Sequence, residues 1–150
     1  MYYDSAKRKI KQILTENEDN SLQHVVDFLQ TTFKSYSWVG IYLVKKNMLQ
    51  LGPWQGSQAT EHTKIPIGQG ICGAAAKTGK TEIVSDVHAD DRYLSCFIST
   101  RSEIVVPIKQ NDTIIGEIDI DSDTPDAFTK KDDQFLKEIA DMLSEHIHNK

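Results

Sequence analysis

The sequence lacks any long hydrophobic run, and no stretch approaches the roughly 18 consecutive apolar residues of a membrane-spanning helix. Its N-terminus, MYYDSAKRKIKQ, carries charged residues without the apolar segment that a secretory signal requires. We therefore expect no membrane association and no secretory leader. An intracellular, cytoplasmic protein is the expected class.

Cysteine is also scarce, since only Cys72 and Cys96 occur, too few for a disulfide-stapled scaffold. In a reducing compartment two cysteines are either inert buried side chains or working thiols. Positive charge is not in excess, because 17 Lys and Arg face 22 Asp and Glu for a net charge of −5. Such a balance does not favour binding to phosphate backbones, so we expect no nucleic-acid partner.

The length of 150 residues, at 17.0 kDa, is that of one domain with a substantial core. Repeats, linkers and low-complexity segments are all missing from the sequence. We expect a single domain over residues 1–150. Residues 1–34 would form N-terminal helices, and residues 35–150 would hold the sheet, the pocket loops and a C-terminal helix.

Hydrophobic periodicity places the helices at the two ends and strands between them. Ser21 is expected to cap the second helix, and Thr129 with Asp132 forms a capping box before the last one. Strand pairs are expected at 38–44 with 48–54 and at 102–109 with 113–121, each joined by a hairpin turn. The pattern predicts an α+β fold with a central antiparallel sheet flanked by helices.

Gly68, Gly70 and Gly73 reproduce the spacing of a dinucleotide-binding fingerprint. The following helix is short, the preceding strand contains Pro66, and no second βαβ half exists, so a Rossmann fold is disfavoured. We expect instead that these glycines let backbone amides approach a small polar ligand at a helix start. The set His62, Cys72, His88 and Cys96 has zinc-ligand chemistry but no compact zinc spacing, and we expect no metal site.

Three acids share one face of a strand, because Glu117, Asp119 and Asp121 alternate with isoleucines. A solvated sheet face explains such a pattern, and we expect it for Glu117. Glu103, on the paired strand, can add a fourth carboxylate. Crowded carboxylates raise the pKa of one of them, which would supply a proton donor near neutral pH.

Aromatic and thiol side chains lie in the neighbouring segments. Trp38 and Tyr42 fall on one face of their strand, where they either pack in the core or wall a ligand pocket. Cys72 lies near the start of a short helix, and the amide dipoles there are expected to lower the pKa of its thiol. Cys96 precedes Glu103 at the edge of an acid-rich loop.

Several blocks of sequence resemble one family in order along the chain. They are WVGIYL (38–43), LGPWQG (51–56), IPIGQGICG (65–73), SDVH (85–88), RSEIVVP (101–107) and IDIDS (118–122). The chain thereby resembles the free methionine-(R)-sulfoxide reductases, which are stand-alone GAF-domain enzymes. The resemblance extends from about residue 35 to the C-terminus.

This resemblance implies a GAF-like fold, a homodimer, and reduction of free L-methionine-(R)-sulfoxide by thiol chemistry without a metal or an organic cofactor. It implies a catalytic role for Cys96 and a resolving role for Cys72, with a thioredoxin-like protein restoring both thiols. It also implies a substrate-binding and acidic set, namely Trp38, Tyr42, Ile71, Glu103, Asp119 and Asp121.

The sequence departs from the family pattern at His62, where many members carry a third cysteine that acts as a resolving thiol. Only Cys72 or an external thiol could then regenerate Cys96. A different class of function is a non-catalytic GAF domain that senses a small molecule or the redox state. A third class is an inert relative that only dimerises, and an interaction domain of that kind has no need of Asp119 and Asp121 beside Glu103.

Overall fold

A computed structural model of the protein describes residues 2–16, 19–94 and 97–148. Its strands form one six-stranded antiparallel sheet in the order β3-β2-β1-β6-β5-β4. The elements are α1 (Tyr2–Glu16), α2 (Ser21–Thr32), β1 (Trp38–Lys45), β2 (Met48–Gln55), β3 (Lys64–Pro66), α3 (Gly70–Thr78), β4 (Glu82–Val84), the 3₁₀ turn η1 (Val87–Ala89), β5 (Ser102–Gln110), β6 (Thr113–Ser122) and α4 (Lys130–His148). The expected α+β class, with helices flanking an antiparallel sheet, is confirmed.

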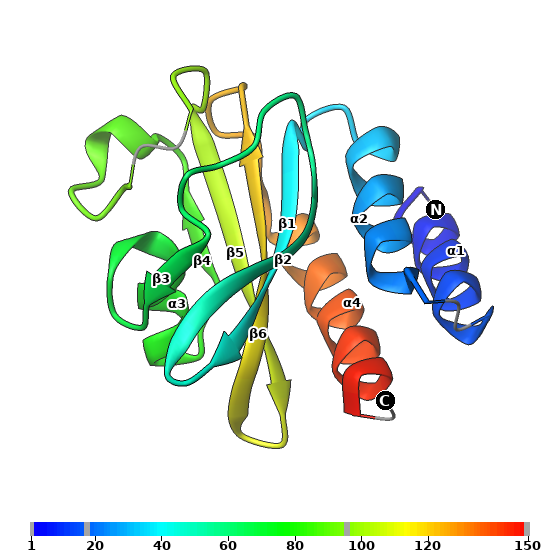
Figure 1. The fold of residues 1–150 in the computed structure, drawn as a ribbon. Helices are drawn as coiled ribbons and strands as arrows, with labels where there is room; N and C mark the ends of the chain where they lie inside the picture. Colours follow the sequence, from blue (N-terminus) through cyan, green and yellow to red (C-terminus); the bar gives the residue numbers. More distant parts are fainter. Residues whose placement is uncertain (1, 17–18, 95–96, 149–150) are drawn as a thin grey trace.

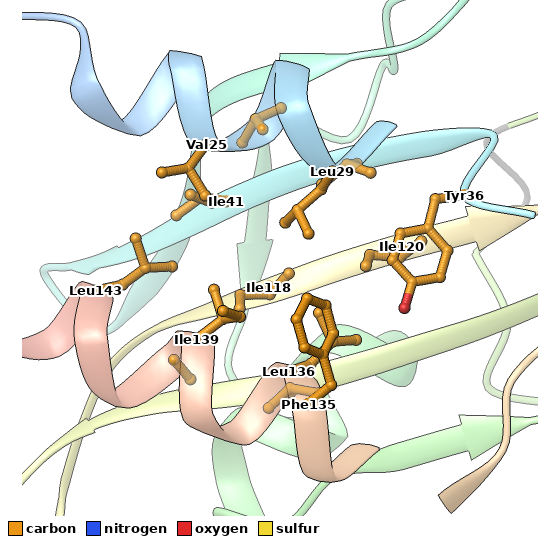
Figure 2. Packing of buried hydrophobic residues seen from close by; sticks show 14 of the residues in the cluster. Val25, Leu29, Tyr36, Ile41, Ile118, Ile120, Phe135, Leu136, Ile139 and Leu143 are labelled. Carbon is orange, nitrogen blue, oxygen red and sulfur yellow. The ribbon is translucent and has the colours of Figure 1, made fainter. Parts of the chain in front are cut away.

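The helices are divided between the two sides of the sheet. Figure 1 shows α1, α2 and α4 together on one side of the sheet and α3 on the other, while the short strands β3 and β4 form its two edges. The larger hydrophobic core fills the first side, where sheet residues such as Ile118 and Ile120 pack against Leu29 of α2 and Ile139 of α4 (Figure 2). These side chains are at most 1% exposed, so this core stabilises the sheet through apolar burial.

Both predicted hairpins form, and the turn residues explain why. Lys46 and Asn47 have φ angles of 52° and 62°, the left-handed values of a two-residue turn between β1 and β2. The turn between β5 and β6 is one residue shorter than the sequence suggested. Gln110 already pairs with Thr113, which leaves Asn111 and Asp112 as the loop.

Of the two predicted helix N-caps, the structure confirms the one before α4 and contradicts the one at Ser21. The amide of Thr129 donates to Oδ2 of Asp132 at 2.9 Å, and the amide of Lys131 donates to Oγ1 of Thr129 at 3.2 Å, so the capping interaction before α4 is confirmed. The expectation for Ser21 is wrong. Ser21 is already the first residue of α2 and is buried, and Asn20 stands at the N-cap without a side-chain bond.

The glycine-rich segment before α3 is a tight turn rather than a dinucleotide loop. A Cβ at Gly73 would lie 2.8 Å from the carbonyl oxygen of Pro66, so only glycine lets α3 pack this closely on the end of β3. All strand pairs are antiparallel, which agrees with the rejection of a Rossmann fold. None of the helices described is long and apolar enough to cross a membrane.

Candidate active site

The candidate site lies on the side of the sheet that faces α3. Adjacent residues in an antiparallel pair project to the same side, so the strand register defines rows of side chains. Trp38 of β1 lies opposite Asp121 of β6, which lies opposite Glu103 of β5. In the next rows Asp119 lies opposite Gly40, and Glu117 lies opposite Tyr42. We call the four carboxyl groups Glu103, Glu117, Asp119 and Asp121 the acid cluster.

All members of the acid cluster are buried, with exposed fractions of 5% for Glu103, 0% for Glu117 and 4% for each aspartate. The prediction that Glu117 faces solvent is therefore wrong. The reason is that β6 is an interior strand whose site-facing side is covered by α3. Among the described residues the only polar group close to the carboxyl oxygens of Glu117 is the weakly donating thiol of Cys72. Burial, and secondarily the charge of Asp119, raises the pKa of Glu117 well above its usual value.

Glu103 lies between the two aspartates and is within hydrogen-bonding reach of both. Burial and then the negative charges of Asp119 and Asp121 raise the pKa of Glu103 well above its usual value. Burial also raises the pKa of Asp119, while the Glu103 contact acts in the opposite direction. Burial and the charge of Asp119 raise the pKa of Asp121 as well, so the three carboxyl groups titrate as a coupled set and hold protons more tightly than free carboxyl groups do. The strand pattern predicted a proton donor in this set; the raised pKa values are consistent with that role, which stays a prediction.

Cys72 is the third residue of α3, is 6% exposed and carries a free thiol. The expectation that the helix start lowers its pKa is wrong. Burial raises the pKa of Cys72 well above its ordinary value, and all four carboxylates of the acid cluster add to the rise, Asp119 most strongly. The local dipole of a nine-residue helix is outweighed by desolvation and by nearby negative charge. Cys72 is a protonated thiol at neutral pH.

A small cavity separates α3 from the sheet. It has a volume of about 20 Å³, and the residues around it are Tyr42, His62, Ile65, Ile71, Cys72, Leu94, Glu103 and Asp119. Tyr42 is oriented because its hydroxyl donates to the backbone carbonyl of His62 at 2.7 Å. Ile71, assigned to substrate binding by resemblance, lies beside Cys72 in this lining. A thiol, two carboxyls and an aromatic ring therefore converge on one point.

Trp38 belongs to an aromatic group at the end of the same face. Its ring stacks on Trp54 at a centroid distance of 6.2 Å and contacts Phe97 at 5.9 Å. Two glycines make room for it, since a Cβ at Gly40 or Gly56 would lie 2.3 or 2.4 Å from the indole. Trp38 does not line the small cavity, but it lies in the row of Asp121 and Glu103.

Cys96, the predicted catalytic thiol, lies outside the described residues. Two of its chain neighbours can be placed. Leu94 lines the cavity, and a Cβ at Gly70 would lie 2.8 Å from its Cδ1. Phe97 is buried against Trp38. The described parts of this loop thus contact the site both before and after Cys96.

The zinc-type set considered from the sequence is not assembled by the described residues. His88 is exposed, and its Nε2 lies 3.1 Å from a guanidinium nitrogen of Arg101. A different set does come together, because ligand atoms of Cys72, Glu103 and Asp119 lie within 4.8 Å of one another. Sequence reasoning also missed Ile65 and Leu94 as lining residues and the burial of Glu117. Glu117 lies opposite Tyr42, an aromatic residue expected in the core or in a pocket wall, and this pairing could have indicated that Glu117 is buried.

Comparison with known proteins agrees with this arrangement. The family model described as "GAF domain" matches residues 17–147. A free methionine-R-sulfoxide reductase from Escherichia coli is 38% identical over 107 residues, which cover 71% of this chain and 64% of that protein. A structure of the free methionine-R-sulfoxide reductase of Neisseria meningitidis in complex with its substrate has a TM-score of 0.90 and 34% identity, covering 97% of this chain and 88% of that one.

A structure of a type II free methionine-R-sulfoxide reductase from Thermoplasma acidophilum has a TM-score of 0.83 and 36% identity. It covers 93% of this chain and 96% of that one. Sequence identity of 34–36% over nearly the whole of both chains indicates a common family and not only a common fold. The chain belongs to the GAF domain family and, within it, to the free methionine-R-sulfoxide reductases.

Proposed function

We propose that the protein is an oxidoreductase that reduces free L-methionine-(R)-sulfoxide to L-methionine. The observation that carries the proposal is the buried Glu103, whose pKa is raised beside Asp119 and Asp121, at a cavity that the thiol of Cys72 also lines. Reduction of a sulfoxide needs a thiol nucleophile for the sulfur and a proton for the oxygen. Membership of the reductase family supports this reading over a sensor domain.

In the proposed reaction the Cys96 thiolate attacks the sulfoxide sulfur while Glu103 gives a proton to the oxygen. The S–O bond of the substrate breaks, methionine leaves, and Cys96 becomes a sulfenic acid. The Cys72 thiol then attacks that sulfur, so that a disulfide forms and one water molecule is released. A thioredoxin-like dithiol reduces the disulfide and completes the cycle. The raised pKa of Cys72 keeps its thiol protonated and out of competition with Cys96 for the substrate, and Cys72 gives up that proton as it attacks the sulfenic acid, whose oxygen leaves as water.

We propose that substrate binding uses both parts of the site and moves the lining residues apart, because a cavity of about 20 Å³ is far smaller than methionine sulfoxide. Trp38 and Tyr42 would contact the methyl-sulfinyl end, and the carboxylates of Asp119 and Asp121 would pair with the free α-ammonium group. A methionine sulfoxide inside a peptide has no such ammonium, which explains selection of the free amino acid. Because regeneration needs a reducing partner, we place the reaction in the cytoplasm. A homodimer is proposed from the family resemblance and is checked by sedimentation equilibrium.

The test compares two variants that each leave one thiol. Wild-type protein, Cys96→Ser and Cys72→Ser are incubated with both epimers of free methionine sulfoxide, using either dithiothreitol or a thioredoxin system. Wild type should consume the (R)-epimer alone, and Cys96→Ser should consume neither. Cys72→Ser should keep turnover with dithiothreitol, which reduces the sulfenic acid directly, and lose most of it with thioredoxin. Consumption of neither epimer by wild type contradicts the proposed function, and activity of Cys96→Ser contradicts the assigned nucleophile.

A further inference from the structure

The residues Cys72, Glu103 and Asp119 come from three different elements, α3, β5 and β6, yet they present ligand atoms within 4.8 Å of one another. The sulfur is a soft ligand and the two carboxylates are hard ones. Zinc is bound by this combination of thiolate and carboxylate ligands, and three protein ligands leave a fourth position open. We call these residues the thiol–carboxylate triad.

All three residues of the triad also line the cavity of about 20 Å³ described above. A cavity needs at least roughly 10–15 Å³ to hold one water molecule. The volume of this cavity is therefore enough for one water molecule or one metal ion. In zinc sites the bond lengths are about 2.0–2.3 Å, which separates neighbouring tetrahedral ligands by roughly 3.3–3.7 Å. The widest separation in the triad would contract by about 1.1–1.5 Å to reach that geometry.

The buried carboxylates beside the cavity have unmet bonding capacity. Asp119 lines it, is 4% exposed, and its Oδ1 has no hydrogen-bond partner. Oδ1 of Asp121, equally buried in the next row, is also without one. The Lys and Arg ion pairs of the described residues all lie elsewhere, at Asp4, Glu82, Asp90, Asp133 and Glu138. A buried oxygen without a partner is unfavourable, and a cation in the cavity would satisfy Asp119.

We propose that the thiol–carboxylate triad binds one thiophilic divalent cation of the zinc type, and that the bound ion blocks the site. The ion enters as the protons of the thiol and carboxyl groups leave, so its affinity falls in acid. It acts as an inhibitor rather than a cofactor, because it removes both the proton donor and the resolving thiol. Only the inhibition rests on the proposed function. The binding itself does not.

The ligand set also predicts selectivity. Mg²⁺ and Ca²⁺ require about six or more oxygen ligands, and Mg²⁺ keeps several of its waters. A cavity of about 20 Å³ with one sulfur ligand offers neither the ligand number nor the space. We therefore expect millimolar Mg²⁺ to leave the site unoccupied.

Absorption spectroscopy with Co²⁺ tests whether the thiol is a ligand, because Co²⁺ bound to thiolate has an intense near-ultraviolet charge-transfer band. The purified, pre-reduced full chain is titrated with Co²⁺ as wild type, Cys72→Ser and Cys96→Ser. The band should appear at one equivalent in wild type and in Cys96→Ser, and Zn²⁺ should abolish it. It should be missing in Cys72→Ser. A band that persists without Cys72, or that is lost without Cys96, overturns the proposed ligand set.

The carboxylate ligands are tested by Zn²⁺ affinity, measured by competition with a chromophoric chelator. Asp119→Asn should bind at least 10-fold more weakly than wild type, and Glu103→Gln provides the same test if the first variant does not fold. Asp123→Asn is the matched control, because Asp123 is exposed on the same segment. Wild-type affinity in the folded Asp119 or Glu103 variants would contradict the site.

Inhibition is read in a single turnover of pre-reduced protein without added thiol, so that no reductant binds the metal. One equivalent of Zn²⁺ should lower methionine formation at least 10-fold, a chelator should restore it, and Mg²⁺ should have no effect. Turnover unchanged by bound Zn²⁺ overturns the inhibitory role. If wild type forms no methionine even without Zn²⁺, the proposed function fails, while the cobalt and affinity results still decide the metal site.

Discussion

The two sides of strand β6 differ in what they contribute to the protein. On one side Ile118 and Ile120 pack into the core formed with α2 and α4. On the other, Glu117, Asp119 and Asp121 alternate with them and are just as deeply buried, although they carry groups that prefer water. Burial of the isoleucines stabilises the fold, whereas burial of ionisable groups opposes it. The same strand therefore supports the structure with one face and holds the candidate chemistry on the other.

This contrast has a physical consequence. Burial alters the proton affinity of carboxyl groups, and active sites are where such alterations concentrate. Three groups of the acid cluster have pKa values raised by burial and by one another. Substitutions on the two sides should therefore separate stability from activity.

The largest effect on stability is expected from the helix-facing side. Ile120 is fully buried between Val39 and Ile104, and Ile120→Ala should lower the free energy of unfolding by about 2–5 kcal/mol. The folded fraction should keep its kcat/KM. Urea denaturation with a parallel activity assay measures both quantities. Ile98→Ala, at a residue that is 94% exposed, is the control and should change stability by no more than about 0.5 kcal/mol.

On the site-facing side, substitution of Glu117 is expected to raise the stability of the protein, by less than Ile120→Ala lowers it. Because its pKa is raised in the folded protein, the folded state holds this proton more tightly than the unfolded state does. That contribution is fully favourable below the unfolded pKa and is lost as the pH rises through the folded pKa. Glu117→Gln does not titrate, so its stability should match wild type near pH 4 and exceed it increasingly at higher pH.

The difference in unfolding free energy between Glu117→Gln and wild type should grow by about 1.4 kcal/mol per pH unit until the pH passes the folded-state pKa of Glu117. Guanidinium denaturation at several pH values measures it. Glu145→Gln, at an exposed position on α4, is the matched control and should run parallel to wild type. A Glu117→Gln protein that is less stable than wild type at pH 8 would mean that Glu117 has a stabilising partner in solution.

The smallest effect is expected at the surface of the loop before Cys96. The guanidinium of Arg92 lies 2.9 Å from Oε1 of Glu82 and 2.7 Å from Oδ2 of Asp90, and its side chain is 43% exposed. Arg92→Ala should therefore change stability by less than about 1 kcal/mol. Since Arg92 is close in sequence to the lining residue Leu94, a rise in KM of a few-fold is expected in steady-state assays. A loss above about 2 kcal/mol would show that this ion pair supports the core.

Much of the fold could be predicted because local patterns and tertiary packing agree. The alternation around Ile118 and Ile120, the turn at Lys46 and Asn47 and the cap at Thr129 all depend on near neighbours in sequence. The site was less predictable because burial depends on distant segments. Nothing near Glu117 in the sequence shows that α3 covers it, and nothing near Cys72 shows that four carboxylates outweigh the helix start.

The central claim is that the acid cluster is retained for chemistry at a cost in stability, and Glu103→Gln tests it most directly. The unfolding free energy and the kcat/KM for free L-methionine-(R)-sulfoxide are measured on the same samples at pH 7. The account predicts that kcat/KM falls by about 10²–10⁴-fold, as expected for loss of a general acid, while stability is unchanged or higher. A variant that keeps its activity, or that loses activity only in proportion to lost stability, would contradict the account.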